Sequence, residues 1–318
     1  MSKIYDVIIL GAGPAGLAAG LYCGRYRLDT LIIEKGNDGG QIAMTNEIEN
    51  YPGQMLEGES GPSLVARMGE QVKHFGAERV SDVIKSVDFS GEVKKLVGGK
   101  EEYQARCVII ATGAFSRPIG CENEGKFKGR GISTCATCDA NFFEDLDIYV
   151  VGGGDSAVEE AMYLTKFGRK VTIIHRRNEL RAAKSIQEKA FKNEKLNFMW
   201  DSVVESVDST EGEDGLLNTM VVKNVKTGEK TTIQASEEDG LFGLFGFIGL
   251  LPKTELFQGI LDMNEGGYLV TDENMHTNIP GVFAAGDVRQ KALRQVVTAA
   301  ADGAIAANQA EHYISSLS

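Results

Sequence analysis

The feature that most constrains the fold of this chain is a local pattern that occurs twice. A short apolar strand is followed by a glycine-rich turn, a helix of small and apolar residues, and a second apolar strand. The first copy has strands at 7–10 and 30–33 around the turn GAGPAG at 11–16, and the second has strands at 148–151 and 170–174 around GGGDSA at 152–157. This arrangement predicts a dinucleotide-binding unit. We therefore expect an α/β protein with two Rossmann-like dinucleotide-binding domains.

The second copy lies between parts of the chain that belong with the first. Segments 108–113 and 245–249 have the composition of strand ends, and a strand and turn at 281–287 precede a helix from about 293 to 313. We expect a discontinuous first domain, residues 1–116 and 248–318, with the second domain, residues 117–247, inserted between its parts. Short crossings near 115–118 and 244–248 would act as hinges.

Bulk properties argue against several classes of protein. The net charge is −12 and no segment concentrates Lys and Arg as nucleic-acid or anionic-membrane binding requires. The apolar run 5–24 holds several glycines and fits a strand–turn–helix better than a membrane span, and 240–252 is too short to span. The N-terminus lacks the pattern of a signal peptide, and five cysteines do not indicate a secreted disulfide framework. We expect a cytoplasmic protein that binds neither membranes nor nucleic acid.

The first glycine turn has the features of a pyrophosphate site. Gly11 permits the tight turn, Gly13 lets the backbone approach a pyrophosphate, and Gly16 lets helix and strand pack closely. Glu34 ends the next strand, where a carboxylate can accept hydrogen bonds from ribose hydroxyls but repels a 2′-phosphate. The site therefore favours FAD or NAD over NADP. The alternative is a glycine-rich turn without a ligand.

The second turn has a different charge at the corresponding place. Gly152, Gly154 and Ala157 repeat the spacing, but the next strand ends in the basic run 175–177, with Arg181 following and no acid. Guanidinium groups pair bidentately with phosphate, so this turn favours NADPH over NADH. The alternative is a solvated basic turn.

Cys135 and Cys138 form the one C-x-x-C motif of the chain. A zinc site would need two further ligands, and the other cysteines and histidines are distant in sequence, so we expect no metal. The pair could be two buried cysteines, or a redox dithiol that moves two electrons by thiol–disulfide exchange. The adjacent Asp139 could be the acid–base group of such a dithiol or, equally, a turn or cap residue.

With these motifs the sequence resembles the low-molecular-weight thioredoxin reductases over essentially its whole length. The resemblance is carried by GAGPAG at 11–16, GGQ at 39–41, ENYPG at 49–53, ATGA at 111–114, CATCD at 135–139, GGGDSAVEEA at 152–161, HRR at 175–177, GVFAAGDVR at 281–289 and Arg294-Gln295. The chain departs from the family at Ala140-Asn141, which replaces the more familiar Gly-Phe, and in the Gly- and Phe-rich stretch 241–251.

The resemblance implies two sets of cofactor contacts and a homodimer. The FAD contacts would be Gly11, Gly13, Pro14, Ala15, Gly16, Glu34, Lys35, Gly39, Gly40, Gln41, Asn50, Gly113, Gly286, Asp287, Arg294, Gln295 and Val296. The NADPH contacts would be Gly152, Gly154, Asp155, Ser156, His175, Arg176, Arg177 and Arg181. It further implies that Cys138 faces the flavin and that Cys135 attacks the disulfide of the partner.

The implied activity is electron transfer from NADPH through FAD to the Cys135–Cys138 disulfide, and on to thioredoxin or a thioredoxin-like dithiol protein. Because the dithiol and the NADPH turn share one domain and both must reach the flavin, we expect that domain to rotate between half-reactions. Rival functions are a relative fed by reduced ferredoxin, a ferredoxin–NADP⁺ reductase, a dithiol oxidase that uses oxygen, and a non-catalytic flavin-bound docking module. The intact NADPH motifs argue against the first and third, and CATC argues against the second.

Overall fold

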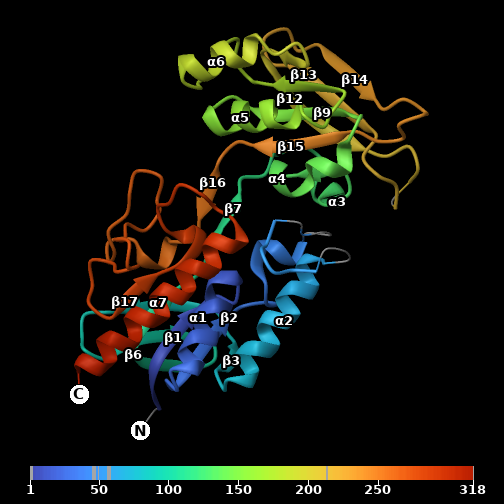
Figure 1. The fold of residues 1–318 in the computed structure, drawn as a ribbon. Coiled ribbons are helices and arrows are strands. Elements are labelled where there is room, and N and C mark those ends of the chain that lie inside the picture. Colours follow the sequence, from blue (N-terminus) through green and yellow to red (C-terminus); the bar gives the residue numbers. More distant parts are fainter. Residues whose placement is uncertain (1–2, 45–47, 49, 56–58, 213, 318) are drawn as a thin grey trace. The chain divides into compact units, whose positions relative to one another are not determined.

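A computed structural model describes residues 3–44, 48, 50–55, 59–212 and 214–317. Glu49, part of the ENYPG block, lies outside the described residues. The chain divides into two compact units, residues 1–115 with 251–318 (unit 1) and residues 116–250 (unit 2) (Figure 1). Each unit has its own sheet and its own core.

Unit 1 is built on one mixed sheet. Its strands run in the order β3-β2-β1-β6-β5-β4, and β17 also pairs with β6. The parallel part contains β1 (Ile4–Leu10), β2 (Thr30–Glu34), β3 (Glu78–Ser81), β6 (Glu102–Ile110) and β17 (Val282–Ala284). The antiparallel extension contains β4 (Ile84–Asp88) and β5 (Lys94–Gly98). Because β1 is followed by β2 on one side and flanked by β6 on the other, the turn after β1 lies at the point where the strand order reverses, which is where such folds bind ligands.

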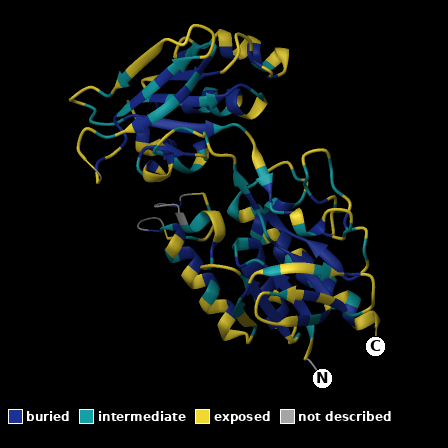
Figure 2. Ribbon diagram, turned by 180° about the vertical axis from the view of Figure 1, so that it is seen from behind, coloured by how far each residue is buried: buried dark blue, intermediate teal, exposed yellow. Residues whose placement is uncertain are grey.

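The strands of unit 1 are apolar because both faces of the sheet are covered. Side chains of β1 alternate between two cores, with Val7 and Ile9 in one and Ile8 and Leu10 in the other. All four are buried, and the interior strands appear as the buried part of the unit (Figure 2). The predicted strands at 7–10 and 30–33 are confirmed.

Three helices of unit 1 cover the sheet: α1 (Pro14–Arg25), α2 (Gly61–His74) and α7 (Val296–Ser316). The short 3₁₀ segments are η1 (Gly40–Met44), η3 (Glu255–Phe257) and η4 (Gly286–Val288). α1 and α7 lie side by side (Figure 1), and a Cβ on Gly303 would stand 2.1 Å from the Ala15 carbonyl oxygen. The predicted helix at 293–313 begins later, at Val296, because Gln295 and Thr298 form a capping box that fixes its first turn.

Unit 2 contains a parallel sheet in the order β11-β10-β9-β15-β8. Its strands are β8 (Ile132–Ser133), β9 (Asp147–Gly152), β10 (Lys170–Ile174), β11 (Leu196–Met199) and β15 (Gly243–Phe247). The helices are α3 (Glu124–Phe127), α4 (Ala136–Asp139), α5 (Asp155–Leu164) and α6 (Lys184–Phe191), with η2 at Ala140–Phe143. A three-stranded antiparallel sheet contains β12 (Ser202–Asp208), β13 (Thr219–Asn224) and β14 (Lys230–Gln234).

The predicted strands at 148–151 and 170–174 are confirmed, whereas the predicted helix at 158–167 is displaced. It begins at Asp155, directly after the turn, because Gly154 is its N-cap, and it ends at Leu164. The chain passes between the units at two places, where β7 (Ala114–Ser116) and β16 (Leu250–Pro252) pair as a two-stranded sheet. The predicted crossing near 244–248 is wrong, because residues 243–247 form β15 inside the sheet of unit 2. Within the described part of the chain, we find no helix whose length and apolarity would let it cross a membrane.

Candidate active site

The first glycine turn is closed by contacts that exclude side chains. Gly11 has φ +107°, and a Cβ there would meet the Ala111 carbonyl oxygen at 2.4 Å. A Cβ on Gly16 would stand 1.9 Å from the Gly11 carbonyl oxygen, which fixes how closely α1 packs on the end of β1. These two glycines therefore shape the turn by geometry, as the sequence predicted for their residue type.

The start of α1 is open to a ligand. Gly13 is the N-cap and carries no side chain to satisfy the first backbone amides, and a Cβ there would meet nothing nearer than the Gly39 carbonyl oxygen at 4.0 Å. The free amides and the helix dipole favour an anion at this place. Glu34, at the end of β2, accepts the Ala12 amide at 3.0 Å and the Gly36 amide at 3.1 Å. Its carboxylate therefore lies beside the turn, where a ribose would follow a pyrophosphate.

A second turn of unit 1 holds polar atoms that lack partners. Oδ1 of Asp287 and Nε of Arg294 are buried and have no hydrogen-bond partner among the described residues. Burial raises the pKa of Asp287, while Lys291 and Arg294 lower it. The Arg294 guanidinium lies 4.2 Å from the centre of the Tyr268 ring. Buried polar groups are nearly always hydrogen-bonded, so these atoms fit a polar ligand with hydroxyls and acceptors.

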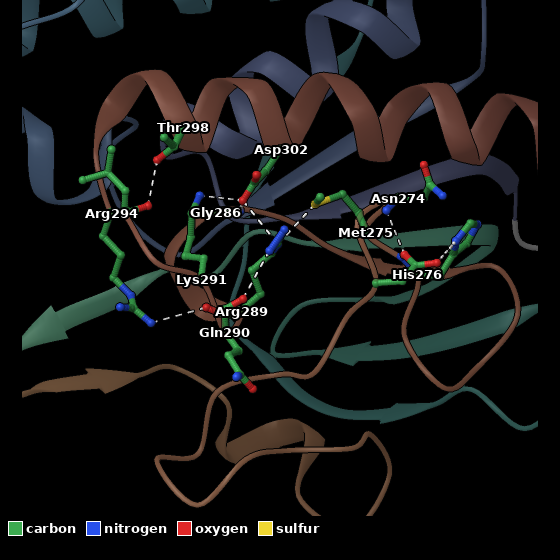
Figure 3. A network of polar contacts seen from close by, with 12 residues as sticks. Asn274, Met275, His276, Gly286, Arg289, Gln290, Lys291, Arg294, Thr298 and Asp302 are labelled. Atoms are coloured by element: carbon green, nitrogen blue, oxygen red, sulfur yellow. Dashed lines mark hydrogen bonds and ion pairs between the residues drawn. The ribbon is translucent and has the colours of Figure 1, made fainter.

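Asp302 of α7 ties this turn to the helix (Figure 3). Its Oδ2 accepts the Gly286 amide at 3.0 Å and lies 2.7 Å from Lys291 Nζ and 3.4 Å from Arg289 Nε. Gly286 has φ +78°, a conformation that favours glycine, and it sits against the start of α1, since a Cβ on it would come 2.8 Å from Ala15 Cβ. The network therefore holds the turn at 286–288 next to the first glycine turn.

Other predicted flavin residues lie around these two turns. Asn50 Nδ2 donates to Gln295 Oε1 at 3.3 Å, and the Gly39 amide donates to the Ala12 carbonyl at 2.7 Å. Gln41 lies in η1, and Gly113 follows β6, with nothing within 4 Å of a Cβ placed on it. The remaining predicted residues are Lys35, which is exposed after β2, Gly40 in η1, Pro14 and Ala15 in α1, and Val296, the first residue of α7. Unit 1 thus fits FAD, with an open helix N-terminus and unpartnered buried polar atoms around one switch point.

The second glycine turn, in unit 2, is built against a histidine. A Cβ on Gly153 would stand 2.3 Å from the His175 ring, and a Cβ on Gly152 would meet Ala157 Cβ at 2.5 Å. His175 is buried, its Nε2 has no hydrogen-bond partner among the described residues, and burial lowers its pKa. The ring is therefore neutral near pH 7 and acts as packing beneath the turn, in contrast to the exposed arginines beside it.

Those arginines leave the rim of the turn positively charged. Arg176, Arg177 and Arg181 are exposed, and their guanidinium groups form no ion pair with the described acidic residues. The Arg181 amide donates to the Gly153 carbonyl at 2.7 Å, which brings the third arginine to the turn. Asp155, at the first position of α5, accepts the Ala183 amide at 2.7 Å and fixes the same loop, and Ser156 is exposed beside it. Free guanidinium groups beside an open helix N-terminus fit a nucleotide that carries an additional phosphate.

The dithiol leaves the same sheet as this turn. Cys135 and Cys138 form a disulfide with their Cα atoms 5.3 Å apart, and both are half-buried. They follow β8, whose register pairs Ser133 with Phe245 of β15, and β15 in turn pairs with β9, which leads into the glycine turn. Because these strands are parallel, the disulfide and the turn both emerge at the carboxyl edge of one sheet. No cluster of three or more potential metal ligands occurs among the described residues.

Asp139 makes a contact that the sequence did not indicate. Its Oδ2 accepts a 2.5 Å hydrogen bond from Ser133 Oγ, and neither α4 nor η2 has a side-chain cap. Asp139 is therefore not acting as a cap residue. Burial raises its pKa, and the hydrogen bond from Ser133 lowers it. A carboxyl group with a raised pKa beside a disulfide is suited to hold or release a proton.

Three residues of these sites were not predicted from the sequence: Ser133, Lys291 and Asp302. A signal existed for Asp302, since it is the one acid within the apolar and small-residue run 296–310. An isolated charge on a buried helix face usually has a partner, and here the partner is Lys291. No sequence pattern marks Ser133.

An α/β protein with two nucleotide-type turns and a C-x-x-C disulfide has the architecture of a nucleotide-dependent disulfide oxidoreductase. The sequence profile of the pyridine nucleotide-disulphide oxidoreductase family matches residues 5–303. The chain belongs to this family.

The relatives are similar over their full length. A thioredoxin reductase of Peptoclostridium litorale is 59% identical over 317 residues, covering 100% of this chain and 99% of that protein. A thioredoxin reductase of Bacillus subtilis is 48% identical, covering 99% of this chain and 96% of that protein. The crystal structure of thioredoxin reductase from Streptococcus pyogenes is 43% identical with a TM-score of 0.91, covering 99% of this chain and all of that one. Within the family the chain therefore belongs to the thioredoxin reductases, which use FAD and NADPH. Fold class and family agree with the sequence prediction.

Proposed function

We propose that this chain reduces thioredoxin, or a thioredoxin-like dithiol protein, at the expense of NADPH. The observation that carries the proposal is the Cys135–Cys138 disulfide at the carboxyl edge of the sheet that also bears the arginine-rimmed turn. A nicotinamide site and a redox disulfide on one unit, with a second nucleotide-type site on the other, match an enzyme that passes electrons in steps.

FAD would be held by unit 1 and NADPH by unit 2. These units correspond to the two predicted domains, residues 1–116 with 248–318 and residues 117–247. When bound, FAD would supply an acceptor for hydride from NADPH and a source of two electrons for the disulfide. On the protein side, the α1 amides and Glu34 would bind pyrophosphate and ribose, while Asp287, Arg294 and Gln295 would bind the rest of the flavin. Arg176, Arg177 and Arg181 would bind the 2′-phosphate of NADPH.

The reduced dithiol would carry out the exchange with the partner. The Cys135 thiolate attacks one sulfur of the partner disulfide, that disulfide breaks, and a mixed disulfide forms. Cys138 then attacks the Cys135 sulfur, which releases the partner with both of its sulfurs reduced and restores the Cys135–Cys138 bond. Asp139 would hold the proton that the thiols exchange in this cycle. Phe142 is 46% exposed next to this motif and offers an apolar contact for docking.

We infer that unit 2 rotates between half-reactions, with Cys138 turned toward the flavin in one arrangement and Cys135 presented to the partner in the other. The support is chemical, because the nicotinamide site and the disulfide belong to one unit and both need the same flavin. The chain crosses between the units at two short strands, β7 and β16, which could absorb the change.

The test is steady-state NADPH oxidation by the FAD-loaded protein, with thioredoxin and a chromogenic disulfide and with NADH as control. Thioredoxin-dependent oxidation of NADPH with little use of NADH is expected. Reduction by ferredoxin but not by NADPH would favour a ferredoxin-dependent relative. Absence of NADPH oxidation with any disulfide acceptor would favour a non-catalytic, flavin-bound docking module.

We also propose a cytoplasmic homodimer. One surface of unit 1, over α1 and α7, has a shallow groove of about 560 Å³ lined by Tyr22, Tyr26, Glu273, Asn274, Ala304, Ile305, Asn308 and Gln309. Tyr22 and Tyr26 are about two-fifths exposed, which is typical of interface aromatics. Light scattering should give twice the chain mass, and Tyr22→Glu combined with Ile305→Glu should give the monomer mass. A monomer in the unaltered protein would overturn the proposal.

A further inference from the structure

Ser133 stands at the centre of the dithiol segment. It is the last residue of β8 and is 7% exposed. Its Oγ donates to Asp139 Oδ2 at 2.5 Å and accepts the Cys135 amide at 3.0 Å. The Cys135 carbonyl oxygen lies 3.3 Å from the same Oγ. One buried hydroxyl thus touches the acid of the motif and both main-chain groups of the first cysteine.

The Ser133 hydroxyl can form hydrogen bonds with its neighbours in both protonation states of Asp139. A serine has one hydrogen to donate and two lone pairs to accept with. When Asp139 is ionised, the Ser133 hydrogen goes to the carboxylate. When Asp139 is protonated, the acid can donate to Ser133 Oγ, and the serine hydrogen can turn to the Cys135 carbonyl oxygen. The Cys135 amide remains a donor to Oγ in both states, so every member of the cluster has a partner whichever form Asp139 takes.

We propose that Ser133 is a positioning residue that couples the protonation state of Asp139 to the main chain of Cys135. The inference deepens the proposed function, because it assigns a proton-linked support to the same dithiol. Its effect is to keep Cys135 in place while the neighbouring acid gains and loses a proton. This coupling transfers no electron. The only proton that is gained or lost is that of the Asp139 carboxyl group.

Among the described residues, only Ser133 lowers the pKa of Asp139. η2 and α5 pack against α4. η2 carries no charged residue, and the acids of α5, Asp155, Glu159 and Glu160, do not shift the pKa of Asp139. Burial raises that pKa, and the Ser133 hydrogen bond opposes the rise. Removing the Ser133 hydroxyl should therefore raise the pKa of Asp139, because nothing would then oppose the effect of burial.

The experiment compares Ser133→Ala with the unaltered, FAD-loaded protein. The first readout is the pH dependence of iodoacetamide alkylation of the dithiol after chemical reduction, and the second is the pH dependence of kcat with saturating thioredoxin. Loss of the charge-assisted bond should move the pH midpoint assigned to Asp139 upward by about one unit. Ser133→Thr, which keeps the hydroxyl, should restore the midpoint.

Two controls separate this effect from general damage. Ser202→Ala removes another buried serine of unit 2, which donates to the Trp200 carbonyl at 2.7 Å, and should leave the midpoint unchanged. Asp139→Asn should abolish the titration assigned to Asp139, and adding Ser133→Ala to it should leave the remaining thiol midpoint of the alkylation profile unchanged. An unchanged Asp139 midpoint in Ser133→Ala, or a shift of the thiol midpoint when Ser133→Ala is added to Asp139→Asn, would overturn the inference.

Failure of the proposed function would appear differently. If the unaltered protein did not reduce thioredoxin, the proposed function would fail. The alkylation profile of the chemically reduced protein would still test Ser133, because it reports on the dithiol itself. If turnover were present and only the predicted shift were missing, the inference alone would fail.

Discussion

Lys291 Nζ lies 2.7 Å from Asp302 Oδ2, and both side chains are nearly buried, at 7% and 10% exposure. The same oxygen accepts the Gly286 amide, so one carboxylate joins α7 to the turn that contains Asp287. Breaking a buried ion pair by removing one partner costs about 3–5 kcal/mol, because the other charge remains buried. We therefore expect the Lys291–Asp302 pair to hold the proposed flavin-binding turn in position.

Asp302→Asn should weaken FAD binding at least about tenfold. A loss of about 1.4 kcal/mol of binding free energy, caused by displacement of the turn, already gives that factor. Flavin fluorescence during titration of the apoprotein measures the dissociation constant. Glu124→Gln is a matched control, because Glu124 is also a buried acid that accepts two backbone amides, from Ile119 and Gly120, but lies in unit 2. Unchanged FAD affinity in Asp302→Asn would contradict this role.

Nucleotide selectivity should depend on the exposed arginines. Arg176→Ala combined with Arg177→Ala should lower the ratio of kcat/KM for NADPH to that for NADH by about 100-fold, since two charge-assisted phosphate contacts are lost. Arg169→Ala is the control, because Arg169 is an exposed arginine of the same unit that pairs with Asp147 and Asp239. Equal ratios in the double variant and the unaltered protein would rule out the arginine pocket.

The two cysteines of the motif should fail in different ways. Cys135→Ser should abolish turnover with thioredoxin while the flavin absorbance still falls on addition of NADPH. Cys138→Ser should change the visible absorbance spectrum, because it removes the sulfur proposed to face the flavin. Stopped-flow absorbance measures both. Loss of bleaching by NADPH in Cys135→Ser would mean that the roles are assigned wrongly.

The other cysteines should be inert in the folded protein. Burial raises the pKa of Cys23 and Cys107 to about 12 and that of Cys121 to about 11. A thiol reacts as its thiolate, so at pH 8 these three remain protonated, and their reactivity should appear only as the pH approaches those values. Mass spectrometry after alkylation of the native, reduced protein should find label on Cys135 or Cys138 first. Rapid labelling of Cys23 would contradict the packing of α1.

Close helix packing gives a stability prediction. Gly303→Ala should lower the free energy of unfolding of unit 1 by about 2–4 kcal/mol, because its Cβ would overlap the Ala15 backbone at the start of α1. Gly69→Ala is the control, since Gly69 lies within α2 and a Cβ there meets nothing within 4 Å. That substitution should stabilise by about 0.5–1 kcal/mol. Urea unfolding of the two variants measures the difference.

Local patterns predicted the strands, the two turns and the C-x-x-C segment, because each depends on residues that are neighbours in sequence. The first turn of α7 was placed wrongly, since its start depends on a side-chain bond between Gln295 and Thr298. The packing of the His175 ring under Gly153 was not predicted, because this contact joins the ends of two different strands. The Ser133–Asp139 bond was missed because nothing in the spacing of those residues distinguishes a buried hydroxyl from an exposed one.

The interrupted construction of unit 1 has a consequence during synthesis on the ribosome. β6 pairs with β1 early in the chain, but β17 and the turn at 286–288 emerge only after all of unit 2. Unit 2 can complete its core first, since domains generally fold as units. The half of the nucleotide site that contains Asp287 and Arg294 is made last. Prosthetic-group loading should therefore be a late event that follows, and does not guide, the maturation of the inserted unit.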